Sequence, residues 1–202
     1  MDYEENWEIE TRFRILNPRR EKDEIFLVFP ANKVVKRYTS KNVDLYLQTG
    51  IEDPNYFLRL RKAEVFFSDG KKRRLCFLNE KRMFDRKYPQ TEMGVRVAFE
   101  RDFKSLSKNY STRKIVVKVS GSRKAYEIEG FEVTRDSIDN LGEFIECGAV
   151  CEEEKDVEIF RERVNAFARE LFEKLNDTGL KVEVEPKIYP ELLTRLYKPF
   201  SR

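Results

Sequence analysis

The segment spanning residues 7–13 constrains the fold most, because apolar or neutral residues alternate with charged ones along it. In a β-strand, successive side chains point to opposite faces, so Glu8, Glu10 and Arg12 share one face. On an ordinary half-buried strand this charged face would meet water. The same alternation recurs along the chain with charges of both signs, which favours a second interpretation in which the charged faces line a common interior.

Further strand and turn signals favour a β-rich fold. Ser68-Asp69-Gly70-Lys71 and Ser120-Gly121-Ser122 are typical of hairpin turns. Residues 154–176 carry apolar side chains at steps of three and four, which predicts an amphipathic helix. About eight antiparallel strands with flanking helices predict an α+β fold, and a closed or nearly closed β-barrel is favoured over a sandwich. The predicted β-segments are residues 7–13, 34–39, 43–48, 56–62, 73–79, 95–101, 113–119, 124–134 and 143–150. The polar residues 81–92, which include Pro89, are predicted to form a loop.

The composition excludes several kinds of chemistry. Histidine is absent from all 202 residues, which excludes a Ser-His-Asp triad, a Cys-His dyad and metals held by histidine. The 40 basic residues nearly balance the 37 acidic ones, whereas nucleic-acid-binding proteins usually show a clearer basic excess. A chain of this length can bury one good core, so a single domain over residues 1–202 is predicted.

The cysteines and the apolar runs indicate a cytoplasmic protein. Cys76, Cys147 and Cys151 lack the further thiolates or histidines that a zinc site needs, so they are predicted to be free thiols in a reducing compartment. No apolar run approaches about 18 residues, and the acidic N-terminus does not resemble a signal peptide, so no membrane association is expected.

Carboxylates and cations concentrate on the predicted strands in a way that suits a polyphosphate ligand. Carboxylate oxygens are hard ligands for Mg²⁺ or Mn²⁺, and Mg²⁺ is typically held by one or two carboxylates plus phosphate oxygens. Arginine and lysine on neighbouring strands would hold the phosphate chain. The candidate carboxylates are Glu8, Glu10, Glu100, Asp136 and Glu146, and the candidate cations are Arg12, Arg59, Arg61, Arg96, Lys114 and Lys118.

Four short motifs follow one another in an order that resembles a known family. Residues 8–12 (E-I-E-T-R) stand in the place of an E-x-E-x-K strand, and residues 58–61 (L-R-L-R) match an L-R-x-R strand. Residues 136–148 are similar to a D-x-V-x-x-L-G-x-F-x-E-x-E segment, and residues 185–193 to a tail that ends in Tyr and Glu-Leu-Leu. Each motif is common by chance, but the four in this order resemble the CYTH family of triphosphate tunnel metalloenzymes, which joins class IV adenylate cyclases and thiamine triphosphatases.

The CYTH resemblance implies an eight-stranded antiparallel barrel whose tunnel binds a triphosphate-containing small molecule. It also implies hydrolysis assisted by Mg²⁺ or Mn²⁺, with inorganic tripolyphosphate, a nucleoside triphosphate or a triphosphate ester as substrate. The implied catalytic residues are Glu8, Glu10 and Arg12. The implied metal ligands are Glu8, Glu10 and Glu146, and Glu100 and Asp136 are further candidate ligands. The implied phosphate-binding residues are Arg12, Arg59, Arg61, Arg96, Lys114, Lys118 and Lys187.

Departures from the family pattern keep other functions open. Arg12 replaces a lysine, Asn79 stands where a lysine is common, and Ala98 and Gly148 stand where carboxylates are expected. The main alternative is a binding module that holds a triphosphate or nucleotide with little catalysis. Class IV adenylate cyclase and RNA 5′-triphosphatase activities are further alternatives, and only the latter would make nucleic acid a partner. The last is a structural or interaction protein that merely exposes polar strand faces.

Overall fold

The computed structural model describes residues 3–18, 25–47, 56–85, 90–99 and 114–197. Its helices are α1 (Ile25–Val28), α3 (Val157–Asp177) and α4 (Tyr189–Tyr197), with 3₁₀ turns η1 (Ala31–Lys33) and η2 (Glu154–Asp156). Its strands are β1 (Tyr3–Ile15), β2 (Val34–Leu47), β3 (Tyr56–Phe67), β4 (Lys72–Asp85), β5 (Gln90–Phe99), β6 (Ile115–Ile128), β7 (Phe131–Ile138), β8 (Gly142–Cys151) and β9 (Val182–Val184).

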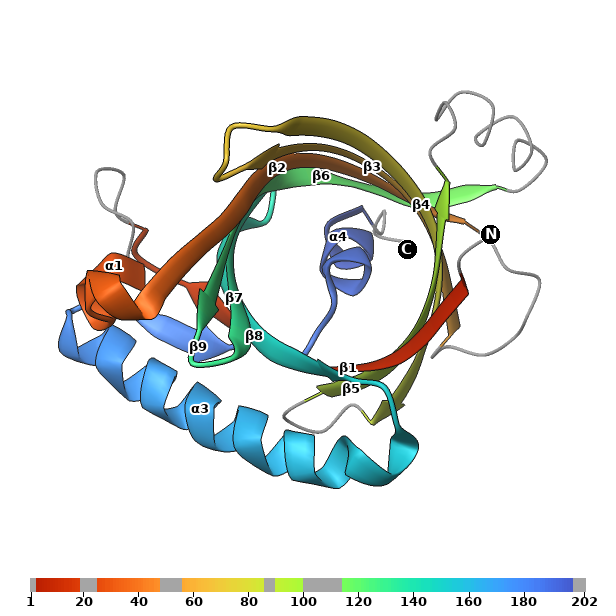
Figure 1. The fold of residues 1–202 in the computed structure, drawn as a ribbon. Coiled ribbons are helices and arrows are strands. Elements are labelled where there is room, and N and C mark those ends of the chain that lie inside the picture. Colours follow the sequence, from red (N-terminus) through yellow and green to blue (C-terminus); the bar gives the residue numbers. More distant parts are fainter. Residues whose placement is uncertain (1–2, 19–24, 48–55, 86–89, 100–113, 198–202) are drawn as a thin grey trace.

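The strands form one sheet that closes on itself. Their order is β5-β4-β3-β2-β6-β7-β8-β1-β9, and β5 pairs with β1 as well as with β4. This additional pairing closes β1 to β8 into a barrel, and β9 extends the sheet beside β1 (Figure 1). The predicted α+β fold with an antiparallel β-barrel is therefore confirmed.

Alternation along β1 places charged side chains inside the barrel and apolar side chains in the hydrophobic core outside it. Glu8, Glu10 and Arg12 line the interior cavity, while the side chains of Ile9 and Phe13 are fully buried in the main hydrophobic core. Because side chains of a strand alternate between its two faces, burying Ile9 and Phe13 outside the barrel forces the charged residues inward.

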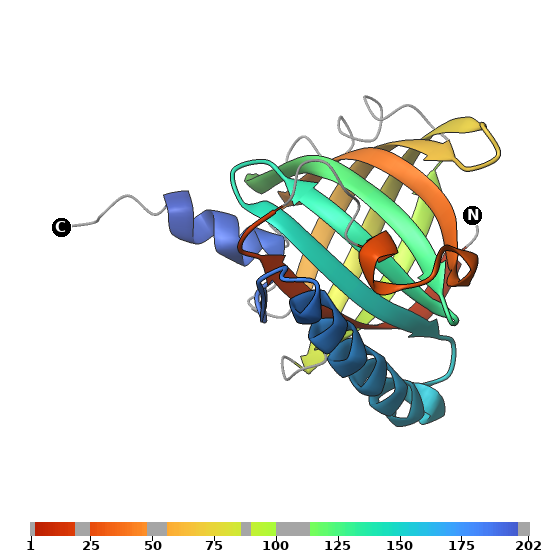
Figure 2. The ribbon, with the colours of Figure 1, turned by 90° about the vertical axis from the view of Figure 1, so that its left-hand side faces the viewer.

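The long helix α3 covers this apolar outer face of the barrel (Figures 1 and 2). Its buried residues recur at helical spacing and pack with Ile9, Phe13 and Phe131 in one core. The rings of Phe131 and Phe167 stack with centroids 4.4 Å apart. The helix begins three residues later than predicted, after η2, and the amphipathic helix itself is confirmed. Its buried residues are Val157, Val164, Phe167, Ala168, Leu171 and Leu175.

The short helix α4 lies at one end of the barrel, as Figures 1 and 2 show. Tyr189 and Leu193 pack in a second apolar cluster with Val119, Ile138 and Phe144. The Tyr189 ring meets Phe144 edge-on at a centroid distance of 5.1 Å. The interior cavity is therefore bounded on this side by α4 and the residues that precede it.

The predicted turn at Ser120-Gly121-Ser122 is wrong, because these residues continue β6. Gly121 is needed there for a close approach: a Cβ atom on it would lie 2.3 Å from the backbone oxygen of Ser137. The turn instead comes at Glu129 and Gly130, both of which have positive φ, and it divides the segment predicted as one strand over 124–134. Likewise, β2 runs unbroken through residues 40–42, where two segments were predicted.

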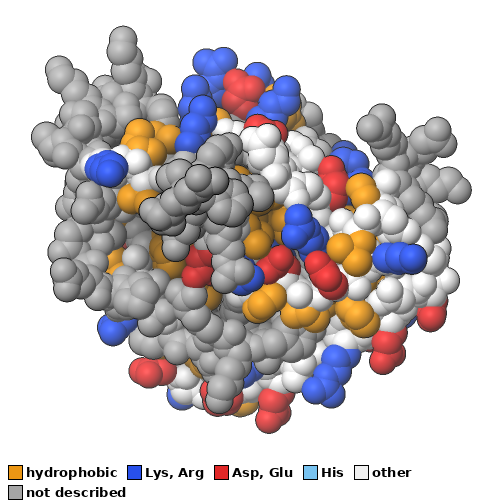
Figure 3. Space-filling view, turned by 180° about the vertical axis from the view of Figure 1, so that it is seen from behind, with side chains coloured by type: hydrophobic (Ala, Val, Ile, Leu, Met, Phe, Trp, Pro, Cys, Tyr) orange, Lys and Arg blue, Asp and Glu red, His pale blue; other side chains and the backbone are white. Residues whose placement is uncertain are grey.

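Across the described part of the chain, no helix combines the length and apolar character needed to cross a membrane. Among the described side chains visible in Figure 3, acidic and basic ones lie interspersed. This surface agrees with the nearly balanced composition of 40 basic and 37 acidic residues.

Candidate functional site: a charged cavity inside the barrel

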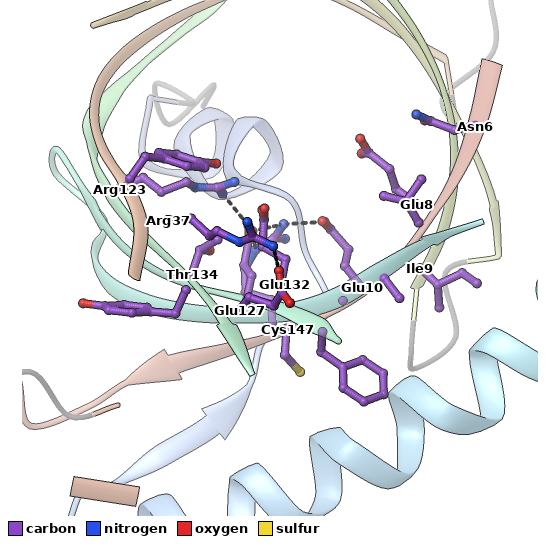
Figure 4. A pocket seen from close by; sticks show the side chains of 18 of the residues that line it. Asn6, Glu8, Ile9, Glu10, Arg37, Arg123, Glu127, Glu132, Thr134 and Cys147 are labelled. Carbon is purple, nitrogen blue, oxygen red and sulfur yellow. Dashed lines mark hydrogen bonds and ion pairs between the residues drawn. The ribbon is translucent and has the colours of Figure 1, made fainter. Parts of the chain in front are cut away.

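The barrel encloses a cavity of about 790 Å³ that is lined by charged and aromatic side chains (Figure 4). Ligand pockets for drug-sized molecules usually span about 300–1,000 Å³, so this volume suits a small molecule. Both signs of charge line it. The acidic lining residues are Glu8, Glu10, Asp69, Glu127, Glu132 and Glu146, and the basic ones are Arg12, Arg37, Arg59, Arg61, Lys81 and Arg123.

One wall of the cavity is a cluster of arginines on β3. Arg61 donates to both carboxylate oxygens of Asp44 on β2, at 2.7 and 2.6 Å. Burial would lower the pKa of Arg61, but the charge of Asp44 outweighs burial and raises it. Arg59 is held more loosely, with a hydrogen bond of 3.4 Å to Asn79 and a distance of 3.8 Å to Asp44. Asp44 therefore fixes Arg61 and leaves Arg59 better able to reach a ligand.

The predicted carboxylate Glu8 lies beside a lysine from β4. The ammonium of Lys81 donates to Glu8 Oε2 inside the cavity. Both side chains are mostly buried, with exposed fractions of 14% for Lys81 and 19% for Glu8. The strand register brings the two side chains together. Lys81 lies opposite Gly94 on β5, Gly94 lies opposite Asn6 on β1, and Glu8 is two residues from Asn6 on the same face of β1.

Arg12 is deeply buried, and all three of its guanidinium nitrogens contact protein acceptors. Nε donates to Glu146 Oε1 at 2.5 Å, NH2 donates to Glu10 Oε1 at 3.0 Å, and NH1 donates to the Lys187 backbone oxygen at 2.8 Å. The guanidinium carbon also lies 4.5 Å from the centroid of the Tyr189 ring. Arg12 thus links β1 to β8 and to the segment that leads into α4.

Arg123 of β6 forms the other half of this buried network. It donates to both oxygens of Asp136, at 2.7 and 2.6 Å, and to Glu146 at 2.5 Å. The Tyr189 hydroxyl donates to Asp136 at 2.9 Å. Burial by itself would raise the pKa of Glu146, but the charges of Arg12 and Arg123 outweigh burial and hold that pKa below its usual value.

The structure brings many of the predicted site residues together and leaves others apart. Glu8, Glu10, Arg12, Arg59, Arg61 and Glu146 line the one cavity, whereas Asp136 lies behind it as the partner of Arg123. Arg96 lies in β5 opposite Asn79, but its side chain is outside the described set, and Glu100 lies outside the described residues altogether. Lys187 contributes its backbone oxygen to Arg12.

Lys114 and Lys118 need a correction, because neither lines the cavity. Lys118 is exposed and lies opposite Leu45, which packs with the apolar cluster of β3 and β4 outside the barrel. Its neighbour Val119 takes the inward position opposite Asp44. Lys114 precedes β6 and is exposed as well. The inward face of β6 is therefore the opposite of the one predicted.

The sequence interpretation overlooked Lys81, Arg123 and Asp44 as site residues. Lys81 fell in a polar stretch that was predicted to be a loop, and Arg123 followed the turn predicted at Ser120-Gly121-Ser122. Asp44 could have been found, because Asn42, Asp44 and Tyr46 alternate with Val43 and Leu45 along β2. A polar face on an uninterrupted strand was the missing signal.

The described residues could hold a divalent ion only if phosphate oxygens completed its coordination shell. Among the described residues, no group of three His, Cys, Asp or Glu side chains could hold a metal ion. Glu10 lies opposite Gly148, where the CYTH pattern has a second carboxylate. Mg²⁺ nevertheless needs only one or two carboxylates when substrate phosphates complete its shell, and Glu8 and Glu10 on one face of β1 meet that need.

Known proteins resemble this chain in structure rather than in sequence. No family model matches the sequence, and no curated protein matches it. The PH1819 protein from Pyrococcus horikoshii superposes with a TM-score of 0.70 at 22% identity, over 94% of this chain and 99% of its own. A putative adenylate cyclase from Vibrio parahaemolyticus superposes with a TM-score of 0.62 at 16% identity, over 93% of this chain and 98% of its own.

A third structural likeness is to a chain of the Mediator head module from Schizosaccharomyces pombe. It has a TM-score of 0.57 at 8% identity, over 87% of this chain and 97% of that chain. A fold can host unrelated functions, so the shared barrel by itself assigns no activity. The antiparallel β-barrel predicted from the CYTH-like motifs is confirmed, and these solved structures share its fold.

Proposed function

We propose that this protein is a cytoplasmic enzyme that binds a triphosphate in its barrel and hydrolyses it with the help of Mg²⁺ or Mn²⁺. The observation that carries the proposal is the convergence of Glu8 and Glu10 with Arg59, Arg61 and Lys81 on one cavity. Free cysteines at positions 76, 147 and 151 support a reducing compartment. The proposed substrates are inorganic tripolyphosphate, a nucleoside triphosphate or a triphosphate ester.

The arginine wall supplies the phosphate contacts in this proposal. Arg59 has a buried Nε–H with no hydrogen-bond partner among the described residues, and its other contacts are long. A buried donor without a partner costs free energy, which a phosphate oxygen would recover. Arginine also suits phosphate because its planar fork can donate two parallel hydrogen bonds.

In this proposal, the carboxylates of Glu8 and Glu10 on β1 are the protein ligands of the divalent ion. Glu8 and Glu10 would hold a divalent ion together with phosphate oxygens, and the ion would supply charge stabilisation. Water would add to the terminal phosphorus as the bond to the bridging oxygen breaks, which releases orthophosphate and leaves the shortened phosphate chain. Lys81 lies beside Glu8 and would neutralise an oxygen of the terminal phosphate. Arg59 and Arg61 would keep the phosphate chain in line with the attacking water.

A triphosphate-binding module with little catalysis is the second candidate, and a specific observation favours it. The lining carboxylates proposed for the ion already have basic partners: Glu8 has Lys81, and Glu10 and Glu146 have Arg12. An ion would have to compete with these partners. Binding without turnover would follow if it could not.

Phosphate release tests the proposal directly. The purified chain should release phosphate from tripolyphosphate, ATP or GTP only in the presence of Mg²⁺ or Mn²⁺. Separate detection of orthophosphate, pyrophosphate and cyclic AMP in the ATP reaction distinguishes hydrolysis from adenylate cyclase chemistry, and an RNA with a 5′-triphosphate tests the RNA alternative. Tight binding of tripolyphosphate without any release would overturn hydrolysis and favour the binding module.

Replacing Arg59 with alanine should weaken tripolyphosphate binding by about 10- to 150-fold, which corresponds to about 1.5–3 kcal/mol for a charged hydrogen bond. Isothermal titration calorimetry measures the change. Lys62→Ala is the matched control, because Lys62 is an exposed cation on the same strand and does not line the cavity. Equal affinities for the Arg59→Ala and Lys62→Ala chains would remove Arg59 from the phosphate site.

A further inference from the structure

Arg12 lies between the two carboxylates that the CYTH pattern assigns to a metal ion. Its NH2 is 3.0 Å from Glu10 Oε1 on β1 and 2.5 Å from Glu146 Oε1 on β8. Arg12 and Glu146 face each other directly across this strand pair, and Glu10 lies two residues before Arg12 on the same face. A guanidinium thus occupies the position between the carboxylates that a bridging cation would need.

The surroundings hold this guanidinium firmly. Its side chain is 5% exposed, its NH1 donates to the Lys187 oxygen at 2.8 Å, and the Tyr189 ring covers it at 4.5 Å. The second oxygen of Glu146 accepts from Arg123 at 2.5 Å. Both oxygens of Glu146 are therefore bound by arginines, and a metal ion at either oxygen would compete with a guanidinium.

The backbone prevents a further carboxylate from joining this group. An ideal Cβ atom on Gly148 would lie 2.6 Å from the backbone oxygen of Ile9 and 3.1 Å from the Cβ of Glu10. Contacts below 3.0 Å to backbone atoms require the strands to shift. The missing second carboxylate of the late motif is thus matched by close packing of β1 against β8, and a glutamate would not fit there without rearrangement.

We propose that the Arg12 guanidinium replaces a resident divalent ion between β1 and β8, so that Mg²⁺ or Mn²⁺ enters the cavity only as a complex with the triphosphate. A fixed internal cation neutralises Glu10 and Glu146 in the free protein and requires no metal for that purpose. The second part of this inference rests on the proposed triphosphate substrate, whereas the first part concerns the free protein alone.

Metal binding to the free chain tests the first part without any enzymatic readout. In a titration followed by the electron paramagnetic resonance signal of free Mn²⁺, the wild-type chain and the Glu146→Gln chain should bind equally little Mn²⁺. A stoichiometric Mn²⁺ on the wild-type chain that is lost in Glu146→Gln or Glu10→Gln would overturn the proposal, because those carboxylates would then hold a resident ion.

Removing the internal cation provides the reciprocal test. Arg12→Met should gain a single Mn²⁺ per chain, and its thermal midpoint should rise with added Mn²⁺ while the wild-type midpoint does not. The physical reason is that two carboxylates brought together without a counter-charge recruit a cation. An Arg12→Met chain whose Mn²⁺ binding and thermal midpoint match those of the wild type in their response to Mn²⁺ would overturn the proposal.

The second part is tested by equilibrium dialysis with a non-hydrolysable imido analogue of tripolyphosphate. The wild-type chain should retain Mn²⁺ only together with the analogue and in equal amounts. Retention of Mn²⁺ without the analogue, or of the analogue alone when both are supplied, would overturn joint entry. Phosphate release is measured separately from all three experiments. A chain that releases no phosphate yet shows the expected Mn²⁺ behaviour would contradict the proposed hydrolysis and support the role of Arg12.

Discussion

Replacing Arg123 with leucine should lower the free energy of unfolding by about 3–5 kcal/mol, the usual cost of removing one partner from a buried ion pair. Arg123 compensates two buried carboxylates, with distances of 2.6 Å to Asp136 Oδ2 and 2.5 Å to Glu146 Oε2. Among the described residues, leucine would leave Asp136 with the Tyr189 hydroxyl, and Glu146 with Arg12 and the same hydroxyl. Urea denaturation near neutral pH measures the change.

The choice of pH follows from the titration of Glu146. Burial opposes its charged form, but Arg12 and Arg123 outweigh burial and hold its pKa below the ordinary value. A carboxylate with a lowered folded-state pKa stabilises the fold above its unfolded pKa of about 4.3, and that stabilisation is lost as the pH falls through the folded value. Near neutral pH the full contribution is present, and the difference between the two chains is clearest.

Arg37→Leu is the matched control for Arg123→Leu. Arg37 also pairs with a glutamate, Glu127, but its side chain is 53% exposed. Exposed pairs contribute about 0–1 kcal/mol, so this variant should unfold almost as the wild type does. If the two leucine variants had the same unfolding free energy, the buried network around Arg123 would not be the stabilising feature proposed here.

Replacing Glu8 with glutamine should reduce metal-dependent phosphate release by more than about 100-fold, since groups that merely support a metal ligand already contribute about 10- to 100-fold. Glu8 keeps one carboxylate pointed into the cavity beside Lys81, and glutamine preserves its size while removing its charge. Glutamine can still accept a hydrogen bond from Lys81, so the thermal midpoint should fall much less than in the Arg123→Leu chain. Steady-state phosphate release at saturating substrate measures turnover.

Glu64→Gln serves as the control for Glu8→Gln. Glu64 is a glutamate of β3 that pairs with Lys72 and Arg74 and does not line the cavity. Its replacement should leave both turnover and the KM for tripolyphosphate unchanged. Wild-type turnover in the Glu8→Gln chain would show that Glu8 is not a ligand of the ion.

Strict alternation made the first and third strands predictable from the sequence. In β1 and β3 the charged residues keep one face over several positions, and the buried residues Ile9 and Phe13 leave them no direction other than inward. Arg59 and Arg61 were placed correctly on the cavity wall for the same reason. Period-two patterning identifies a face reliably when the opposite face is buried.

The sixth strand shows why the remainder could not be predicted. Gly121 lies between two serines, which is typical of a turn, yet its role is to let β7 approach closely. Because side chains alternate, assigning the wrong face to a strand moves every residue to the other side. Lys118 was therefore placed inside and Arg123 was overlooked, although the structure has the reverse arrangement.

A polar strand inside a barrel also looks like a loop in the sequence. Lys81 and its neighbours were assigned to a loop because charged residues usually mark solvated segments. Where a strand lines a charged cavity, its inward side chains pair with charged groups of other strands, so that face lacks the apolar residues that usually mark a strand in a sequence. The buried ion pairs of this barrel depend on contacts between distant segments, such as Arg12 with Glu146, which local patterns do not encode.

The pairing of β1 makes completion of the site depend on contacts that are distant in sequence. The strand that carries Glu8, Glu10 and Arg12 pairs with β8 and β9, and Arg12 donates to the backbone of Lys187, 175 positions further along the sequence. Contacts so distant in sequence form slowly, because a long loop must first be closed. The site is therefore complete only after β1, β8 and the segment around Lys187 have come together, and a folding intermediate that lacks these pairings has no finished site.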